Sequence, residues 1–366
     1  MASIRTRAAI LKAFATPFDI EDVTVEEPRA DEIRVRLVAT GICHTDQVMA
    51  DGALRAGLPV VLGHEGAGVV EAVGGSVTTH AVGDHVVLSF AHCGQCAACR
   101  EGAPTYCQDF MTRNFACARP DGTSAFICDH PPHSHFFGQS SFANYVVCSP
   151  RNAVVVPKNV PLELLGPLGC GIQTGAGAVI NALKVGPGAT LAVFGVGAVG
   201  LSAIMAARAV GATTIIAIDR NSRRLDLATE LGATDRVLVG DEDSTDQIRG
   251  IAPLGLRFTL DTTGVPSVVS TAISVLASRG VCGLVAGSPG VAASLPINHM
   301  FGGGRSIRGI TEGDAVPSSF IPYMVELYRQ GRFPFDKMIE FFPFEQINTA
   351  MAKAASGEVV KPVIRF

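Results

Sequence analysis

Several features that would assign this chain of 366 residues to other classes of protein are absent from its sequence. Basic residues are not in excess, because 29 Lys and Arg stand against 33 Asp and Glu, for a net charge of -4. Little is therefore present to neutralise a phosphate backbone, which argues against a nucleic-acid partner. The 40 glycines follow no tripeptide period, which excludes a collagen-like chain.

The N-terminal stretch MASIRTRAAILKAF lacks the apolar core and the small-residue cleavage site of a signal peptide. We therefore expect a cytoplasmic protein whose 10 cysteines bind metal or act as reactive thiols instead of forming a disulfide framework. Residues 190–207 are apolar over a length that could span a membrane. Glycines interrupt them, however, and a second apolar run ending at Asp219 follows. A buried strand, turn, helix and strand explain this pattern better, so we expect no membrane partner.

Hydrophobic residues make up 48% of the chain, which is enough apolar material for two sizeable cores. Short runs in the first 150 residues alternate polar with apolar positions, which predicts an antiparallel sheet or barrel; they include 32–37, 69–73 and 86–88. After about residue 171, apolar runs alternate with helical patterns, which predicts a parallel sheet; they include 190–194, 198–210, 214–218, 222–231 and 267–277. The sequence thus predicts an α/β protein with a β-rich part and a doubly wound part.

A G-x-G-x-x-G pattern lies between one of these apolar runs and the helical pattern after it. Its glycines allow the tight turn, the approach of the backbone to a pyrophosphate, and the close packing of helix on strand. Asp219 ends the next apolar run and would bind the ribose hydroxyls of NAD while repelling the 2′-phosphate of NADP. The preference for NAD over NADP is weakened by three nearby arginines, Arg220, Arg223 and Arg224. The alternative to a dinucleotide site is a βα turn that binds no ligand. The expected coenzyme contacts are Gly195, Val196, Gly197, Ala198, Val199, Gly200, Asp219 and Arg224.

Four cysteines lie within the 15-residue segment 93–107, in an otherwise irregular stretch. Four thiolates suit a closed tetrahedral zinc site that stabilises the fold. An iron–sulfur cluster is less favoured, because ferredoxin spacing would place the last cysteine three residues after the third and a proline after it. The expected ligands of this structural zinc are Cys93, Cys96, Cys99 and Cys107.

Three other motifs carry metal-binding residue types, namely CHTD at 43–46, GHEG at 63–66 and LGCG at 168–171. Taken singly, each Cys or His is more often a buried core residue than a metal ligand. Together with the four-cysteine segment, GVGAVG and the closing segment, they resemble the zinc-dependent medium-chain alcohol dehydrogenases over essentially the whole chain. The resemblance implies a GroES-like catalytic domain from residues 1–170 and 311–366, and a Rossmann coenzyme domain from residues 171–310.

The resemblance also implies the roles of single residues. Cys43, His64 and Cys170 would bind a catalytic zinc and leave a fourth position for water or substrate. Thr45 would receive the proton of the alcohol, Asp46 would orient the ring of His64, and Glu65 would tune the metal. On the coenzyme side, the residues expected to face the pyrophosphate are His44 and Lys361. Many relatives carry a proton-relaying histidine where this chain has Val48.

The segment 133–142 is similar to the substrate-lining segment of the aryl-alcohol dehydrogenases, which favours a small aromatic alcohol or aldehyde as substrate. Three phenylalanines and one valine would then form an apolar slot; they are Phe90, Phe136, Phe137 and Val48. The alternative is that these rings are ordinary core. Glutathione-dependent formaldehyde oxidation, general aliphatic alcohol oxidation and, more remotely, non-catalytic sensing of NAD(H) are the other functions considered.

The resemblance implies a homodimer or homotetramer assembled through the coenzyme domains, with two zinc ions per chain. Four cysteines receive no role, and buried free thiols are the default for them; they are Cys117, Cys128, Cys148 and Cys282.

Overall fold

The computed structural model describes residues 3–52, 57–127, 131–240, 244–287 and 290–366, and the chain divides into two compact units. Unit 1 comprises Met1–Cys170, Val316–Glu326 and Asp336–Phe366, and unit 2 comprises Gly171–Ala315 and Leu327–Phe335. Cys128 lies outside the described residues. The predicted fold class, a GroES-like β-rich domain with a Rossmann-type parallel sheet, is confirmed.

Two segments that the sequence analysis places in the first domain belong to unit 2, namely residues 311–315 and 327–335. Asn181 donates its side-chain N–H to the carbonyl oxygen of Gly313 at 3.1 Å. Arg332 donates to the carbonyl oxygen of Ala209 at 2.7 Å. These contacts attach both segments to the neighbouring helices of unit 2.

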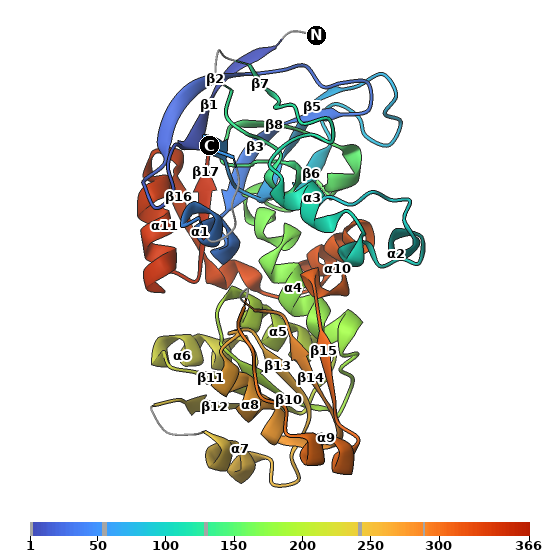
Figure 1. The fold of residues 1–366 in the computed structure, drawn as a ribbon, viewed down its shortest axis with the longest axis vertical. Helices are drawn as coiled ribbons and strands as arrows, with labels where there is room; N and C mark the ends of the chain where they lie inside the picture. Colours follow the sequence, from blue (N-terminus) through green and yellow to red (C-terminus); the bar gives the residue numbers. More distant parts are fainter. Residues whose placement is uncertain (1–2, 53–56, 128–130, 241–243, 288–289) are drawn as a thin grey trace. The chain divides into compact units, whose positions relative to one another are not determined.

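Unit 1 is built on two sheets, shown in the upper half of Figure 1. Its strands are β1 (Ile4–Leu11), β2 (Asp19–Val25), β3 (Ile33–Gly41), β4 (Val60–Val61), β5 (Glu65–Val73), β6 (His85–Leu88), β7 (Phe126–Ile127), β8 (Tyr145–Cys148), β9 (Ala153–Val155), β16 (Ile339–Pro343) and β17 (Lys361–Arg365). One sheet has the order β4-β1-β2-β7 and the other β16-β17-β3-β5-β6-β9, with β8 paired to β3. Its helices are α1 (His44–Ala50), α2 (Ala97–Arg100), α3 (Phe110–Phe115) and α11 (Ile347–Ser356), and α10 (Pro317–Arg329) begins in unit 1 and ends in unit 2.

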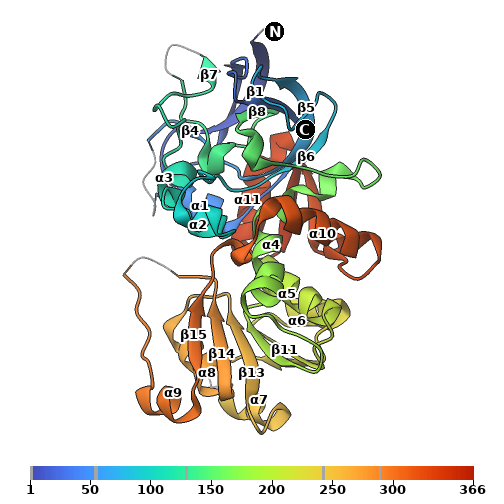
Figure 2. The same cartoon turned by 90° about the vertical axis from the view of Figure 1, so that its right-hand side faces the viewer.

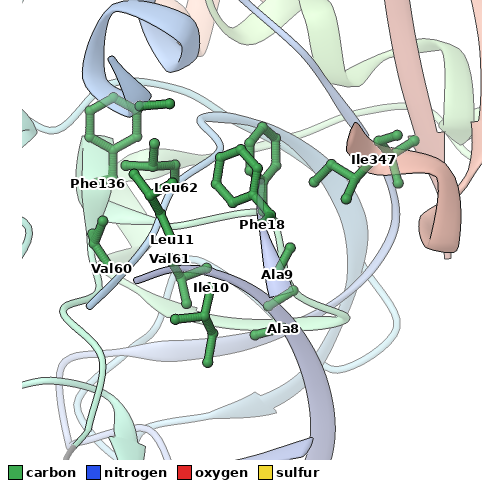
Figure 3. Packing of buried hydrophobic residues seen from close by; sticks show 14 of the residues in the cluster. Ala8, Ala9, Ile10, Leu11, Phe18, Val60, Val61, Leu62, Phe136 and Ile347 are labelled. Atoms are coloured by element: carbon green, nitrogen blue, oxygen red, sulfur yellow. The ribbon is translucent and has the colours of Figure 1, made fainter. Parts of the chain in front are cut away.

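The largest core of unit 1 packs around β1, β4 and the segment after Leu62. Leu11, Val61 and Leu62 are fully buried, and Phe136 lies beside them (Figure 3). In strand β3 the apolar positions Ile33, Val35 and Leu37 are buried as the sequence pattern predicts, and Arg36 is exposed. Arg34 departs from the predicted alternation, because it is buried as well. The core thus fixes β4 and Leu62, which lead into the segment that carries His64.

Unit 2 is a parallel six-stranded sheet of order β12-β11-β10-β13-β14-β15, part of which is seen in the lower half of Figure 2. Its strands are β10 (Thr190–Phe194), β11 (Thr214–Asp219), β12 (Asp235–Leu238), β13 (Leu256–Asp261), β14 (Leu276–Leu284) and β15 (Ser306–Gly309). Its helices are α4 (Gly171–Gly177), α5 (Ala198–Ala209), α6 (Ser222–Leu231), α7 (Thr245–Ile251), α8 (Pro266–Ser274) and α9 (Ile297–Gly303). Crossover helices between parallel strands produce this doubly wound arrangement.

Local chemistry sets the ends of several elements of unit 2. Helix α6 begins where the side chain of Asn221 accepts two main-chain N–H groups, and it ends at Gly232, whose φ of 128° is open only to glycine. Helix α8 stops at Ser274, three residues before the predicted end, because β14 begins at Leu276. No described helix has the length and hydrophobicity that a membrane span requires, and residues 190–207 form β10 and most of α5.

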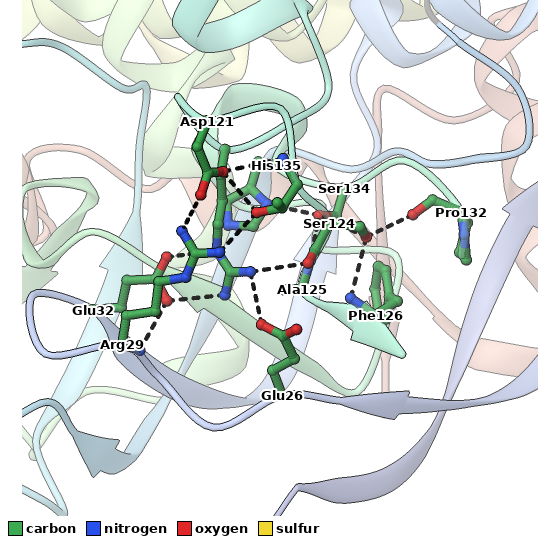
Figure 4. Close-up of polar contacts among 12 residues, drawn as sticks. Glu26, Arg29, Glu32, Asp121, Ser124, Ala125, Phe126, Pro132, Ser134 and His135 are labelled. Carbon is green, nitrogen blue, oxygen red and sulfur yellow. Dashed lines mark hydrogen bonds and ion pairs between the residues drawn. The ribbon is translucent and has the colours of Figure 1, made fainter. Parts of the chain in front are cut away.

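A buried arginine connects the irregular stretch after α3 to the segment between β2 and β3, whose Glu26 and Glu32 are seen in Figure 4. Arg119 is 3% exposed and donates to Glu32 at 2.7 and 3.0 Å and to Glu26 at 2.8 Å. Farther along the same stretch, Ser134 lies 2.7 Å from Nδ1 of His135. This network fixes a segment that has little secondary structure of its own.

Candidate active site

Asp46, on the first turn of α1, joins two of the predicted zinc ligands. Its Oδ2 accepts the main-chain N–H of Cys43 at 2.9 Å. Its Oδ1 accepts the main-chain N–H of Gly63 at 3.1 Å and lies 3.0 Å from Nδ1 of His64. The carboxylate is fully buried, so a single side chain fixes the start of α1 to the segment that carries His64.

The surroundings of His64 determine which of its ring nitrogens is available. Because an ionised carboxylate only accepts hydrogen bonds, Nδ1 carries the proton that faces Asp46. Nε2 is buried and has no hydrogen-bond partner. Burial lowers the pKa of His64, but the charges and hydrogen bonds of Asp46 and Cys43 together raise the pKa well above its ordinary value. Metal binding at Nε2 would therefore displace a proton from the ring.

The structure brings Cys43, His64, Glu65 and Cys170 together, with their ligand atoms all within 4.8 Å of one another. The hydrogen bond to Cys170 lowers the pKa of Cys43 well below its ordinary value, against the opposing effect of burial. Two thiols, an imidazole and one further position form the donor set of catalytic zinc in dehydrogenases. The orphaned Nε2 atom and the convergence of two sulfurs upon it fit a zinc ion.

Glu65 and Lys361 form a buried ion pair next to these ligands. The ammonium of Lys361 donates to both carboxylate oxygens of Glu65 at 2.8 Å and to the carbonyl oxygen of Ile42 at 3.0 Å. Burial raises the pKa of Glu65 and Lys361 opposes that shift. The three donors of the ammonium thus face protein acceptors, a different arrangement from the pyrophosphate contact that the sequence analysis expects of Lys361.

The four cysteines of the second cluster also converge, with all sulfurs within 4.8 Å of one another. The sulfurs of Cys93 and Cys99 are 3.9 Å apart, close to the separation of about 3.8 Å that a tetrahedral zinc site with bonds of about 2.3 Å requires. Main-chain N–H groups of Gln95 and Cys96 point at the sulfur of Cys93 at 3.4 and 3.3 Å and lower its pKa to about 6. This arrangement favours a thiolate and fits a closed metal site.

The glycine-rich loop of unit 2 lies between β10 and α5, as a dinucleotide site requires. A Cβ on Gly200 would lie 2.0 Å from the carbonyl oxygen of Gly195, so only glycine lets the helix approach the strand. A Cβ on Gly197, the N-cap of α5, would meet no atom within 4 Å, which leaves room for a phosphate at the helix N-terminus. Asp219 ends β11, and its Oδ2 accepts the N–H of Val196 at 2.8 Å. The loop therefore fits a dinucleotide.

The remaining coenzyme candidates differ in exposure. Ala198 and Val199 begin α5, and Arg224 is half-buried on α6, with Arg220 and Arg223 exposed. On α1, His44 is exposed, whereas Thr45 and Val48 are half-buried. The hydroxyl oxygen of Thr45 lies 3.9 Å from the sulfur of Cys43, which places it beside the predicted metal.

The predicted substrate-lining phenylalanines belong to the core of unit 1, because Phe90, Phe136 and Phe137 are at most 3% exposed. The ring of Phe137 stacks on the ring of His64 with centroids 4.5 Å apart and planes 24° apart. The ring of Phe136 meets His64 edge-on at 5.3 Å. Both rings thus contact a candidate ligand, and their contact with a substrate stays a prediction.

Two buried polar residues at this site escaped the sequence analysis, namely Gln139 and Ser89, which contact the main chain beside His64 and Cys170. No motif marks them, because their partners are backbone groups.

Of the cysteines without a role, burial raises the pKa of Cys117 to about 12, that of Cys282 to about 11, and that of Cys148 further. All three behave as buried neutral thiols.

Comparison with known proteins gives two matching families and several relatives. Residues 29–158 match the family described as alcohol dehydrogenase GroES-like domain, and residues 198–330 match zinc-binding dehydrogenase. Geraniol dehydrogenase of Castellaniella defragrans is 46% identical, over 99% of this chain and 98% of its own. An alcohol dehydrogenase zinc-binding domain protein of Burkholderia ambifaria is 52% identical with a TM-score of 0.98, covering 100% of this chain and 99% of its own. Benzyl alcohol dehydrogenase of Acinetobacter calcoaceticus is 44% identical with a TM-score of 0.96, covering 99% of each.

Proposed function

Because the chain belongs to the zinc-dependent medium-chain alcohol dehydrogenases, we propose that it oxidises a primary aromatic alcohol of the benzyl type to its aldehyde, reversibly, with NAD. The observation that supports this most is the convergence of Cys43, His64 and Cys170, with Nε2 of His64 buried and without a hydrogen-bond partner. The aromatic substrate is supported by the likeness to the benzyl alcohol dehydrogenase.

A zinc ion held by these three side chains would supply Lewis acidity, which makes the proton of an alcohol easier to remove. Thr45 would accept that proton, since its hydroxyl lies beside Cys43 and is half-buried. Val48 occupies the position of the histidine relay, so Thr45 would pass its own proton on to the ribose hydroxyls of the coenzyme and to water. Asp46 would hold the ring of His64 with Nε2 toward the metal.

In unit 2, Asp219 would bind the ribose hydroxyls of the coenzyme and repel a 2′-phosphate, which favours NAD over NADP. Its carboxylate is already oriented by the main-chain N–H groups of Val196 and Asn221, both at 2.8 Å. Such an oriented carboxylate needs little rearrangement to accept a ligand.

We propose two zinc ions per chain, the second held by the four cysteines of 93–107.

A second candidate substrate is an allylic terpene alcohol, because one relative is a geraniol dehydrogenase. In benzyl alcohol and in geraniol alike the carbinol carbon is bonded to an unsaturated carbon. Steady-state rates with benzyl alcohol, geraniol, ethanol and S-hydroxymethylglutathione, each with NAD and with NADP, discriminate the candidates. Fastest turnover of S-hydroxymethylglutathione would contradict the proposal, and zinc binding without NADH formation from any alcohol would favour a sensor of NAD(H).

We also propose that the chain forms a homodimer or homotetramer through unit 2. Strand β15 is the edge of the parallel sheet and all four of its residues are exposed. Nearby in the sequence, Phe301 and Ile297 are 87% and 64% exposed. An open sheet edge favours pairing with another strand, and light scattering of the purified protein measures the oligomer. The thiol ligands require a reducing compartment, which supports a cytoplasmic location.

A further inference from the structure

We propose that Gln139 and Ser89 are positioning residues that hold the main chain at two zinc ligands, His64 and Cys170, in a fixed relation. This rests on the proposed function, because it takes these two residues as ligands of one metal. The bonds concerned are buried and lie wholly inside unit 1, and they use two side chains that no sequence motif identifies.

Gln139 forms hydrogen bonds to the main chain on both sides of Glu65. Its side-chain N–H donates to the carbonyl oxygen of His64 at 2.9 Å, and its Oε1 accepts the N–H of Gly66 at 3.1 Å. The side chain is 2% exposed, so water does not compete for these bonds. A buried amide that both donates and accepts in this way fixes where β5 begins and hence where His64 lies.

Ser89, directly after β6, connects Gln139 to the main chain beside the second ligand, Cys170. Its carbonyl oxygen receives the side-chain N–H of Gln139 at 3.4 Å and that of Asn152 at 3.1 Å. Its hydroxyl donates to the carbonyl oxygen of Gly169, the residue before Cys170, at 2.7 Å. A Cβ on Gly169 would lie 1.9 Å from the carbonyl oxygen of Leu88, so this turn lies directly against the end of β6. Hydrogen bonds of the Gln139 and Ser89 side chains therefore link the main chain at His64 to the main chain before Cys170.

The backbone around Gln139 is held in a conformation that such residues seldom adopt. His135, Phe137 and Ser140 have φ values of 65°, 51° and 56°, in the left-handed region. Such conformations persist only where surrounding contacts enforce them, and they concentrate at functional sites. Here the hydroxyl of Ser140 donates to the carbonyl oxygen of Val61 at 2.6 Å. The same stretch places the ring of Phe137 on the ring of His64.

These contacts act on the metal through its ligands, so the direct readout is the metal itself. Gln139→Met keeps the length of the side chain but removes its donor and its acceptor. Ser89→Ala removes the hydroxyl that donates to the carbonyl oxygen of Gly169. Asn348→Leu is the control, because the amide of the exposed Asn348 also donates to and accepts from the main chain of one residue, Phe18, at 2.9 and 2.8 Å, in another part of unit 1.

Zinc release from each purified holoprotein to a chromogenic chelator separates the two metal sites. The phase from the site of Cys43 is the one that a Cys43→Ala variant lacks. We expect Gln139→Met to release this zinc at least about tenfold faster than Asn348→Leu, as loss of a support behind a metal ligand does. Ser89→Ala should act in the same direction, and the release from the four-cysteine site should stay unchanged. The absorption bands of cobalt substituted at the Cys43 site should shift in both variants.

A release rate and cobalt spectrum in Gln139→Met that equal those of Asn348→Leu would overturn the inference. If Gln139→Met does not fold, the same comparison with the milder Ser89→Ala decides. NADH formation by the unaltered enzyme tests the proposed function separately. Zinc binding without NADH formation would refute the function and leave the result on Gln139 standing.

Discussion

The ammonium of Lys361 lies 2.8 Å from both carboxylate oxygens of Glu65, and the two side chains are 2% and 0% exposed. A buried pair of this kind adds little stability compared with apolar residues, but removing one partner leaves an uncompensated charge in the interior. The pair therefore keeps the negative charge of Glu65 neutralised next to Cys43 and His64.

Lys361→Met is expected to lower the free energy of unfolding by about 3–5 kcal/mol, because it leaves Glu65 buried and unpaired. The double variant Lys361→Met with Glu65→Gln should recover most of that loss, since no buried charge remains. Urea denaturation of the two holoproteins measures the difference. Equal stability of the single and the double variant would show that the pair is not coupled.

Asp46→Asn is expected to weaken zinc binding at the Cys43 site by about 10–100-fold, because the charge that orients His64 is lost. Chelator competition measures the affinity. Asp51→Asn, at the other end of α1, is the matched control, since the side chain of Asp51 accepts a hydrogen bond from Gln47 on the same helix. An Asp46→Asn affinity equal to that of the control would contradict this role.

Cys107→Ser is expected to reduce bound zinc from two ions per chain to one, because a tetrahedral site loses one of its four sulfurs. Atomic emission analysis counts the metal, and limited proteolysis should cut residues 94–106 faster than in the unaltered protein. Cys282→Ser, whose thiol is buried in unit 2, serves as the control and should keep both ions. Two zinc ions in Cys107→Ser would exclude this cluster as a zinc site.

His135 should make the protein less stable in mild acid. Burial, with Arg119 and Arg29 nearby, lowers the pKa of His135 to about 3, whereas an unfolded histidine has a pKa of about 6.5. Between these values the unfolded chain binds a proton that the folded chain does not, so stability falls as pH falls from about 6.5 toward 3. At pH 5 the loss relative to pH 8 is about 2 kcal/mol.

His135→Asn tests this dependence, because asparagine tolerates the positive φ of this position and does not titrate. The difference in unfolding free energy between the unaltered protein and this variant should shift by about 2 kcal/mol between pH 8 and pH 5. Urea midpoints at the two pH values measure it. A difference that is the same at both would show that His135 does not control acid stability.

Much of this architecture follows from local patterns. Strand β10 and helix α6 have the predicted limits, because a short apolar run and a capped helical pattern are local signals. Helix α1 was not predicted, because its seven residues carry catalytic residue types instead of an apolar periodicity. The irregular stretch after Cys93 holds α2 and α3, which are too short to give a periodic signal.

At the site, the metal ligand candidates could be named because their residue types and spacing form motifs. The partners of Lys361, Gln139 and Ser89 could not, because they lie 50 to 319 residues away in the sequence. Gln139 and Ser89 bind backbone groups, which leave no trace in residue identity. Long-range pairing of this kind depends on sheet register and packing, which the sequence does not display.

We propose above all that the chain oxidises a benzyl-type alcohol with NAD at a zinc held by Cys43, His64 and Cys170. The most direct measurement is the rate of NADH formation by the purified zinc-loaded protein with benzyl alcohol and with ethanol. Burial and stacking of an aromatic ring are worth about 2 kcal/mol or more, so kcat/KM for benzyl alcohol should exceed that for ethanol by about 30-fold or more. No NADH from benzyl alcohol, or an equal kcat/KM for ethanol, would contradict the account.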